Sequence, residues 1–353
     1  MFDATATSKG SKNNPHRLLS RPVYSGGRVT RDFRDPHPAW DSNERPMKSA
    51  DVKHWLALRI RHSYQFLSSP LAIVFLTHSP KVHPGYGISW RKRIWLGFRF
   101  WRNHSRVTSG TSWRAHLIMA MKLLEIPPGV AGAVVECGCW KGGATVNLSL
   151  ICEMTGRTLK VYDSFEGLPP PRNGDAIAQR TFRQGFIPGI FCGTLEEVTA
   201  NVRKYGAIDV CEFHKGWFED TLPDHTGEIV LMFLDVDFYA SLRDCLLNLW
   251  PRLVDGGFVF LDEYLNIPYC AVFYSEKFWS RYFSCAPPGL VGTGTGVQVG
   301  MFYTDPSIRF RKGQLQGSES TAYCIKGTRA VWDYYPEDAT APELEATAPP
   351  TAS

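Results

Sequence analysis

From residue 132 onward, short runs of β-branched and apolar residues alternate with segments whose apolar residues recur at helical spacing. We expect strands over 133–137, 158–163, 209–215, 228–235 and 257–262, and helices near 142–153, 195–204 and 239–253. Strands separated by helices pair in parallel, because the crossover between parallel strands leaves room for a helix. The pattern therefore predicts a Rossmann-like, doubly wound and mostly parallel α/β sheet.

Two predicted strands end in residues suited to a nucleoside ligand. Ligands of such sheets bind at the carboxyl ends of the strands. Glu136 lies at the end of the first strand and is followed by Gly138, Gly142 and Gly143, an order that lacks the GxGxxG turn of dinucleotide sites. Asp163 ends the second strand, where a carboxylate can accept both hydroxyls of a ribose. These features favour S-adenosylmethionine over NAD, with plain packing glycines as the alternative reading of the first turn.

Three further carboxylates follow the fourth and fifth predicted strands, at Asp235, Asp262 and Glu263. Neighbouring strand ends lie about 5 Å apart, so these side chains can converge. Carboxylates that close repel one another unless a cation lies among them, and an all-oxygen set suits Mg²⁺. The alternative is that Asp237 and Asp262 cap helices and point to solvent.

Five motifs taken together carry a resemblance to a known family. In chain order between Trp113 and Trp279 they are VVECGCWKGG, VYDSFEGLPPP, GWFEDTLP, FLDVDFYASLRDCL and PRLVDGGFVFLDEY. This set resembles the macrocin O-methyltransferase family, which implies a class I methyltransferase fold that uses S-adenosylmethionine and Mg²⁺. Carried over to this chain, the resemblance implies metal ligands at Asp235, Asp262 and Glu263. It implies cofactor contacts at Glu136, Gly138, Gly142, Asp163, Ser164, Gly216, Trp217 and Asp235.

The chain departs from the family pattern at two points. Glu263 stands where the family commonly has a second Asp, and no histidine follows His225, although family members use a downstream histidine as the general base. The base must therefore be another group. Asp237 is the nearest carboxylate outside the implied ligand set, and His214 at the end of the third strand is the second candidate.

These features predict an enzyme, an S-adenosylmethionine-dependent and Mg²⁺-assisted O-methyltransferase. Its acceptor would be a hydroxyl of a sugar or of another natural product, and we expect this small molecule, not a nucleic acid, as its partner. The competing hypothesis is a catalytically silent cofactor-binding or scaffold protein that is recruited through a basic N-terminal arm. The identity of the acceptor does not follow from the residues.

The N-terminal part differs in charge from the rest. Residues 1–110 contain 19 Lys and Arg against 6 Asp and Glu. We expect a flexible basic arm over 1–50, a helical extension over 51–110, the methyltransferase domain over 111–335 and a disordered tail over 336–353. Aromatic and basic residues alternate over 89–106, which predicts an amphipathic helix packed on the domain, or else a surface for phosphates, a membrane or an acidic partner.

The sequence also bears on the cellular compartment and on the oligomeric state. The chain shows neither an apolar run long enough to span a membrane nor an N-terminal apolar segment of a secretory signal. Its 9 cysteines lack zinc-site spacing. We therefore expect a cytoplasmic protein with reduced thiols, which is compatible with a homo-oligomer.

Overall fold

The computed structural model describes residues 49–172, 175, 188–264, 267–293 and 321–329. The chain divides into two units, 1–57 and 58–353. Of the first unit, only the start of helix α1 (Ser49–Thr77) is described. The predicted arm, apart from its last two residues, and the predicted tail lie outside the described residues.

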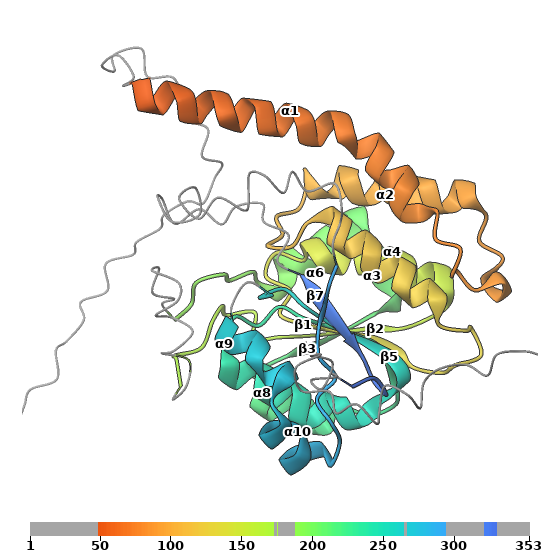
Figure 1. Cartoon of the computed structure of the whole chain (residues 1–353), viewed down its shortest axis with the longest axis vertical. Coiled ribbons are helices and arrows are strands. Elements are labelled where there is room, and N and C mark those ends of the chain that lie inside the picture. The colour runs from red at the N-terminus through yellow and green to blue at the C-terminus, as the bar shows by residue number, and fades with distance from the viewer. Residues whose placement is uncertain (1–48, 173–174, 176–187, 265–266, 294–320, 330–353) are drawn as a thin grey trace, which may run out of the picture. The chain divides into compact units, whose positions relative to one another are not determined.

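A seven-stranded sheet organises the second unit in the order β3-β2-β1-β4-β5-β7-β6. Strands β1 to β5 pair in parallel, and β7 pairs antiparallel with both β5 and β6. The predicted doubly wound, mostly parallel sheet is confirmed (Figure 1). The strands are β1 (Ala133–Cys137), β2 (Leu159–Asp163), β3 (Cys211–Lys215), β4 (Ile229–Leu234), β5 (Leu253–Leu261), β6 (Val291–Gly292) and β7 (Ala322–Ile325).

Helices cover both faces of this sheet, with α2, α3, α4 and α6 on one side and α8 and α10 on the other (Figure 1). The α-helices after α1 are α2 (Trp90–His104), α3 (Trp113–Glu125), α4 (Gly143–Thr155), α6 (Leu195–Tyr205), α7 (Phe218–Thr221), α8 (Tyr239–Leu249), α9 (Ile267–Cys270) and α10 (Glu276–Phe283). Short 3₁₀ turns are η1 (Pro84–Tyr86), η2 (Ile208–Val210), η3 (Leu222–Asp224), η4 (Trp250–Arg252) and η5 (Ala271–Tyr274).

The predicted boundaries shift where a turn replaces the regular element. The helix predicted to reach residue 253 ends at Leu249, because Pro251 cannot continue the helical hydrogen bonding and the chain forms η4 instead. The strand predicted from residue 209 begins at Cys211, since η2 occupies the preceding residues. The short strands β6 and β7 were not predicted.

The core consists of two apolar clusters, one on each face of the sheet. Along β1, Val134 belongs to the cluster shared with α3 and α4, whereas Val135 belongs to the cluster shared with α8. The same alternation separates Phe233 from Leu234 on β4. Side chains alternate between the faces of a strand, so a sheet covered on both sides needs apolar residues at every position. The uninterrupted apolar run of β4 meets this requirement.

A buried polar network joins the N-terminal helices to the sheet. The Asn103 amide on α2 donates to Asn147 Oδ1 on α4 at 3.0 Å, and Asn147 Nδ2 lies 2.9 Å from His116 Nδ1 on α3. Burial lowers the pKa of His116 to about 3, so this ring is neutral and accepts from Asn147. Among the described helices, none is both long and apolar enough to cross a bilayer.

Candidate active site

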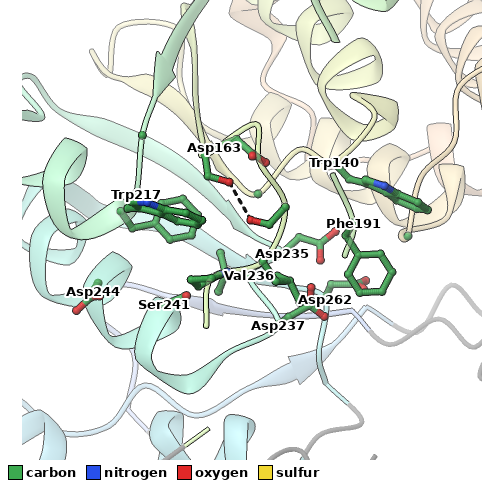
Figure 2. Close-up of a pocket in the computed structure, with 18 of the residues that line it drawn as sticks. Trp140, Asp163, Phe191, Trp217, Asp235, Val236, Asp237, Ser241, Asp244 and Asp262 are labelled. Atoms are coloured by element: carbon green, nitrogen blue, oxygen red, sulfur yellow. Dashed lines mark hydrogen bonds between the residues drawn. The ribbon is translucent and has the colours of Figure 1, made fainter. Parts of the chain in front are cut away.

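A pocket opens at the carboxyl ends of β1, β2, β4 and β5, where the fold predicts a ligand site. Its volume is about 970 Å³, including the part open to solvent. Figure 2 shows Trp217 and Asp244 on one side, Trp140 and Phe191 on the other, and a group of aspartates between them. We call Asp235, Asp237 and Asp262 the acidic cluster.

Asp163 reaches the pocket from the end of β2, and the backbone holds its carboxylate in place. Oδ2 accepts from the Cys139 N–H and Oδ1 accepts from the Phe165 N–H, both at 2.7 Å. Burial raises the pKa of Asp163, while these backbone hydrogen bonds lower it. Each oxygen keeps a lone pair for a further donor, so the carboxylate can bind a pair of hydroxyls.

Glycines let the strand ends approach the pocket closely. Gly138 has φ of 83°, and a Cβ built there would lie 1.9 Å from the Asp235 carbonyl oxygen. Any larger residue would therefore separate the ends of β1 and β4. Gly216 has φ of 149° and turns the chain from β3 toward Trp217, which lines the pocket.

The acidic cluster places several carboxylates close together at the pocket. The Thr111 hydroxyl lies 3.1 Å from Asp262 Oδ1 and 3.4 Å from Asp235 Oδ2. Burial raises the pKa of Asp235 well above its usual range, and the negative charges of Asp262, Glu263 and Asp237 add to the rise. The cluster therefore favours binding of a proton or a cation.

Glu263 contacts the acidic cluster through the backbone of Asp237. Asp237 has φ of 57°, in the left-handed region that residues with a Cβ rarely adopt, and its N–H donates to Glu263 Oε1 at 2.7 Å. Burial raises the pKa of Asp237 to about 7, and the charge of Asp262 contributes. Asp237 lines the pocket and Glu263 does not. In this structure Glu263 supports the turn of residues 235–237.

The alternative that Asp237 caps the following helix is wrong. The N-cap residue of α8 is Phe238, without a side-chain cap bond, and the Ala240 N–H donates instead to Asp175 Oδ1 at 3.0 Å. Asp175 Oδ2 also accepts from the Arg172 N–H. Asp175 thus ties the segment after β2 to the start of α8 and leaves the Asp237 carboxyl to the pocket.

Besides Glu263, three predicted site residues lie outside the pocket lining. Glu136 is fully buried, and within the described part of the chain its carboxylate oxygens have no hydrogen-bond partner. Burial raises the pKa of Glu136 to about 8, with the Thr145 hydroxyl acting in the opposite direction. Gly142 is the N-cap residue of α4, and a Cβ built there would lie 3.0 Å from Val198 Cγ1. The His214 ring stacks on Tyr162 at 4.3 Å.

The other predicted site residues come together at the pocket, which is lined by Gly138, Asp163, Ser164, Gly216, Trp217, Asp235, Asp237 and Asp262. Ser164 also shapes the loop after β2, because its hydroxyl donates to the Gly167 carbonyl and accepts from the Glu166 N–H.

Two aromatic residues of the site, Trp140 and Phe191, were not predicted individually. Trp140 and Phe191 pack edge to face at 5.5 Å, and Arg172 forms ion pairs with Asp244 at 3.0 Å and with Glu219. Trp140 lies inside the first motif, so its position in a turn at a strand end was an available signal. Phe191 and Arg172 come from the long segment after β2, whose contacts depend on tertiary structure.

The residues present fit both groups that the sequence predicts. For a nucleoside cofactor, the Asp163 carboxylate faces the same pocket as the aromatic Trp217. For Mg²⁺, the acidic cluster offers only oxygen ligands, and the one basic residue among the described pocket-lining residues, Arg172, is paired with acidic side chains. No three His, Cys, Asp or Glu side chains of the described ranges are already arranged around one ion position.

Relatives of known activity match the central part of the chain. The family described as Macrocin-O-methyltransferase (TylF) matches residues 114–281. The chain is 37% identical over 171 residues, 44% of its length, to the 8-demethyl-8-(2,3-dimethoxy-alpha-L-rhamnosyl)-tetracenomycin-C 4'-O-methyltransferase of Streptomyces olivaceus, and this match covers 66% of that protein. It is 33% identical over 177 residues, 46% of its length, to the demethyldecarbamoylnovobiocin O-methyltransferase of Streptomyces niveus, of which it covers 68%.

Among solved structures, the O-methyltransferase NovP aligns with a TM-score of 0.47 at 24% identity. The alignment covers 75% of this chain and 100% of NovP. Against the two curated relatives named above, the chain spans about two thirds of their length. From the shared sequence over the sheet and its pocket, the chain belongs to the macrocin O-methyltransferase family, a family of methyltransferase enzymes.

Proposed function

We propose that this protein transfers a methyl group from S-adenosylmethionine to a hydroxyl of a sugar or of another natural-product acceptor, with Mg²⁺ assistance. The observation that carries the proposal is a single pocket that joins two kinds of binding group. Asp163 and Trp217 suit the ribose and base of a nucleoside, and the acidic cluster suits a hydroxyl held on a cation. The relatives support this acceptor class, because one is named for methylation of a rhamnosyl-tetracenomycin.

In this proposal Asp163 accepts the ribose hydroxyls, and Trp217 packs beside the base. When bound, S-adenosylmethionine supplies an activated methyl group on a sulfonium, and Mg²⁺ lowers the pKa of the acceptor hydroxyl. Asp235 and Asp262 are the proposed metal ligands that face the pocket. Glu263 was predicted as the third ligand, and its position behind Asp237 supports a positioning role instead.

The proposed base is Asp237. Its carboxyl lines the pocket beside Asp262, whereas His214, the other candidate, does not line it. Asp237 takes the proton from the acceptor hydroxyl as that oxygen forms a bond to the methyl carbon and the bond from sulfur to that carbon breaks. The products are the methyl ether, S-adenosylhomocysteine and a protonated Asp237. Holding both reactants in one pocket supplies much of the rate.

The test is methyl transfer by the full chain. Labelled S-adenosylmethionine and Mg²⁺ are offered with glycosides that carry free sugar hydroxyls and, separately, with their aglycones, and the products are analysed by mass spectrometry. We expect label on the sugar of at least one glycoside, and none with Asp262→Asn, which should still bind S-adenosylhomocysteine in calorimetry.

Other outcomes distinguish the alternatives. Binding of S-adenosylhomocysteine without transfer to any offered acceptor would favour the silent cofactor-binding protein. Binding of NAD but not of S-adenosylhomocysteine would show that the proposed cofactor is wrong. Full turnover in excess chelator would remove Mg²⁺ from the proposal.

A further inference from the structure

Helices α1 and α2 expose an apolar surface on the side away from the sheet. On α1, Ile60, Leu67, Leu71 and Val74 recur at helical spacing, with exposed fractions of 54%, 74%, 70% and 50%. The opposite side of the same helix is buried, as Ala72 and Ile73 show. This stripe spans about 20 Å along the helix axis.

The surface continues onto α2 through aromatic contacts. The ring centroids of Phe66 on α1 and Trp101 on α2 are 5.8 Å apart, and those of Trp101 and Phe98 are 6.1 Å apart. Phe98 and Trp95 are themselves exposed, while Leu96 and Phe100 of the same helix are buried. The two helices thus form one outer surface, which we call the α1–α2 face.

This face is also positively charged. Arg91, Lys92 and Arg102 are exposed on α2, and none of them forms an ion pair within the described residues. Between Asp51 and Glu125 the sequence contains twelve Lys and Arg and no Asp or Glu. The face therefore has apolar groups and cations, and apart from Asp51 in the first turn of α1 its two helices contain no carboxylate.

We propose that the α1–α2 face docks on the surface of a membrane that contains anionic lipids. Exposed Trp, Phe and Leu side chains enter the boundary between headgroups and acyl chains, and Lys and Arg remain at the level of the lipid phosphates. The helices lie on this surface and do not cross it. The proposal does not depend on the acceptor or on the methyl transfer.

A second copy of the chain fits this face less well. In a two-fold pairing of the α1–α2 face with itself, the cations of α2 would meet the same cations of the other copy without a carboxylate between them. Like charges brought together in this way oppose association. An anionic lipid surface supplies the missing negative charge and also accepts the apolar side chains.

The experiment is co-sedimentation of the full chain with vesicles. One set contains phosphatidylcholine alone, and the other contains about one third phosphatidylglycerol. We expect at least about tenfold stronger binding to the phosphatidylglycerol vesicles, because several cations each add to the attraction. Leu71→Glu and Trp95→Glu should each weaken this binding about tenfold or more, since both replace an exposed apolar group by a carboxylate.

The matched control is Tyr282→Glu, which adds a carboxylate to an exposed aromatic position on α10, outside this face. It should bind vesicles like the unaltered chain. The double variant Arg91→Gln/Arg102→Gln tests the charge separately and should reduce the preference for phosphatidylglycerol. Every variant is first checked for an unchanged unfolding temperature and S-adenosylhomocysteine affinity, so that a folding defect is recognised.

Three results would overturn the proposal. The first is equal binding to both kinds of vesicle, and the second is binding that Leu71→Glu and Trp95→Glu leave unchanged. The third is that the chain does not bind vesicles, is a dimer in light scattering, and becomes a monomer when Leu71 is replaced by Glu. That result would assign the α1–α2 face to a second copy.

Discussion

Asp163 and the acidic cluster are both carboxylate sites in one pocket, but the protein treats their charges differently. Both oxygens of Asp163 accept backbone N–H groups at 2.7 Å, and these hydrogen bonds offset part of the burial that raises the pKa of this carboxyl. Asp235 and Asp262 share one hydroxyl, that of Thr111, and face each other. The comparison indicates that backbone donors already serve Asp163, whereas burial and the repulsion between carboxylates in the cluster favour a bound proton or cation.

Both sites cost stability, because burial raises the pKa of Asp163 and of Asp235, and the rise is larger in the cluster. Backbone donors to Asp163 come from turns that the fold forms in any case, after Gly138 and after β2. The carboxylates of the cluster repel one another, and burial raises the pKa of both Asp235 and Glu263 well above the usual range. We therefore expect substitutions in the cluster to lower activity and raise stability, and substitutions at Asp163 to weaken cofactor binding.

The largest effect is expected for Asp262→Asn. Turnover should fall at least about 100-fold, because the variant loses a proposed metal ligand. The free energy of unfolding of the ligand-free chain should rise by about 1 kcal/mol, because one of the repelling charges is gone. Steady-state kinetics and urea unfolding measure the two quantities. Asp255→Asn, at an exposed position of β5, the strand that ends just before Asp262, is the control, and a similar loss of turnover there would contradict the assignment.

Asp237→Asn should lower kcat by about 100-fold or more and leave the cofactor affinity unchanged, since a base acts in the chemical step. The raised pKa of Asp237, about 7, implies that the unaltered enzyme gains activity as the pH rises through neutrality and Asp237 loses its proton. Bound Mg²⁺ would move this rise in activity to lower pH, because a nearby cation favours the charged form of Asp237. A pH profile of kcat at saturating metal checks this, and an identical profile in the variant would show that Asp237 is not the base.

Much of this comparison was predictable from the sequence, because strand ends in a parallel sheet share one edge. The carboxylates at Asp163, Asp235 and Asp262 each follow an apolar strand, and all three line the pocket. Glu136 lies one residue earlier, inside its strand, and the alternation of side chains turns it into the core. Sequence spacing alone could not separate these two outcomes.

The less predictable parts depend on contacts between distant segments. Thr111 reaches Asp262 across 151 positions, and Asp175 caps α8 across 65 positions. Neither residue belongs to a local motif. The left-handed turn at Asp237 directs its N–H to Glu263, which local propensity does not foresee for a residue with a Cβ.

Asp163→Asn tests whether the Asp163 carboxylate binds the ribose of the cofactor. The amide cannot accept with both of its polar atoms, so the Cys139 or Phe165 N–H and one ribose hydroxyl lose a partner. We expect S-adenosylhomocysteine to bind more weakly by about 1 to 3 kcal/mol in calorimetry. Glu166→Gln, at an exposed position of the same loop, should bind normally. Unchanged affinity in Asp163→Asn would place the ribose elsewhere.

Glu263→Gln distinguishes the predicted metal ligand from the positioning residue that the structure indicates. A Gln oxygen can still accept from the Asp237 N–H, so a positioning role predicts less than about a tenfold change in the Mg²⁺ concentration needed for half-maximal turnover. If the requirement for Mg²⁺ rises as steeply as in Asp262→Asn, Glu263 is the third ligand. Magnesium titration of kcat in both variants gives the answer.

The smallest effect concerns Glu136, a buried carboxyl that does not line the pocket. Its pKa is raised by burial from 4.5 to about 8, so above pH 4.5 the folded chain holds a proton that the unfolded chain has lost. Stability from this group is therefore fully present below pH 4.5 and is lost as the pH rises through about 8. Burial lowers the pKa of both His225 and His116 below 6.5, so their titration does not overlap with a comparison above that pH. The measurement is the free energy of unfolding in urea at about pH 6.5 and about pH 9. Between these two pH values it should fall by about 1 to 2 kcal/mol less in Glu136→Gln than in the unaltered chain. An equal loss in both proteins would mean that Glu136 is charged across this range and has a partner when the cofactor is absent.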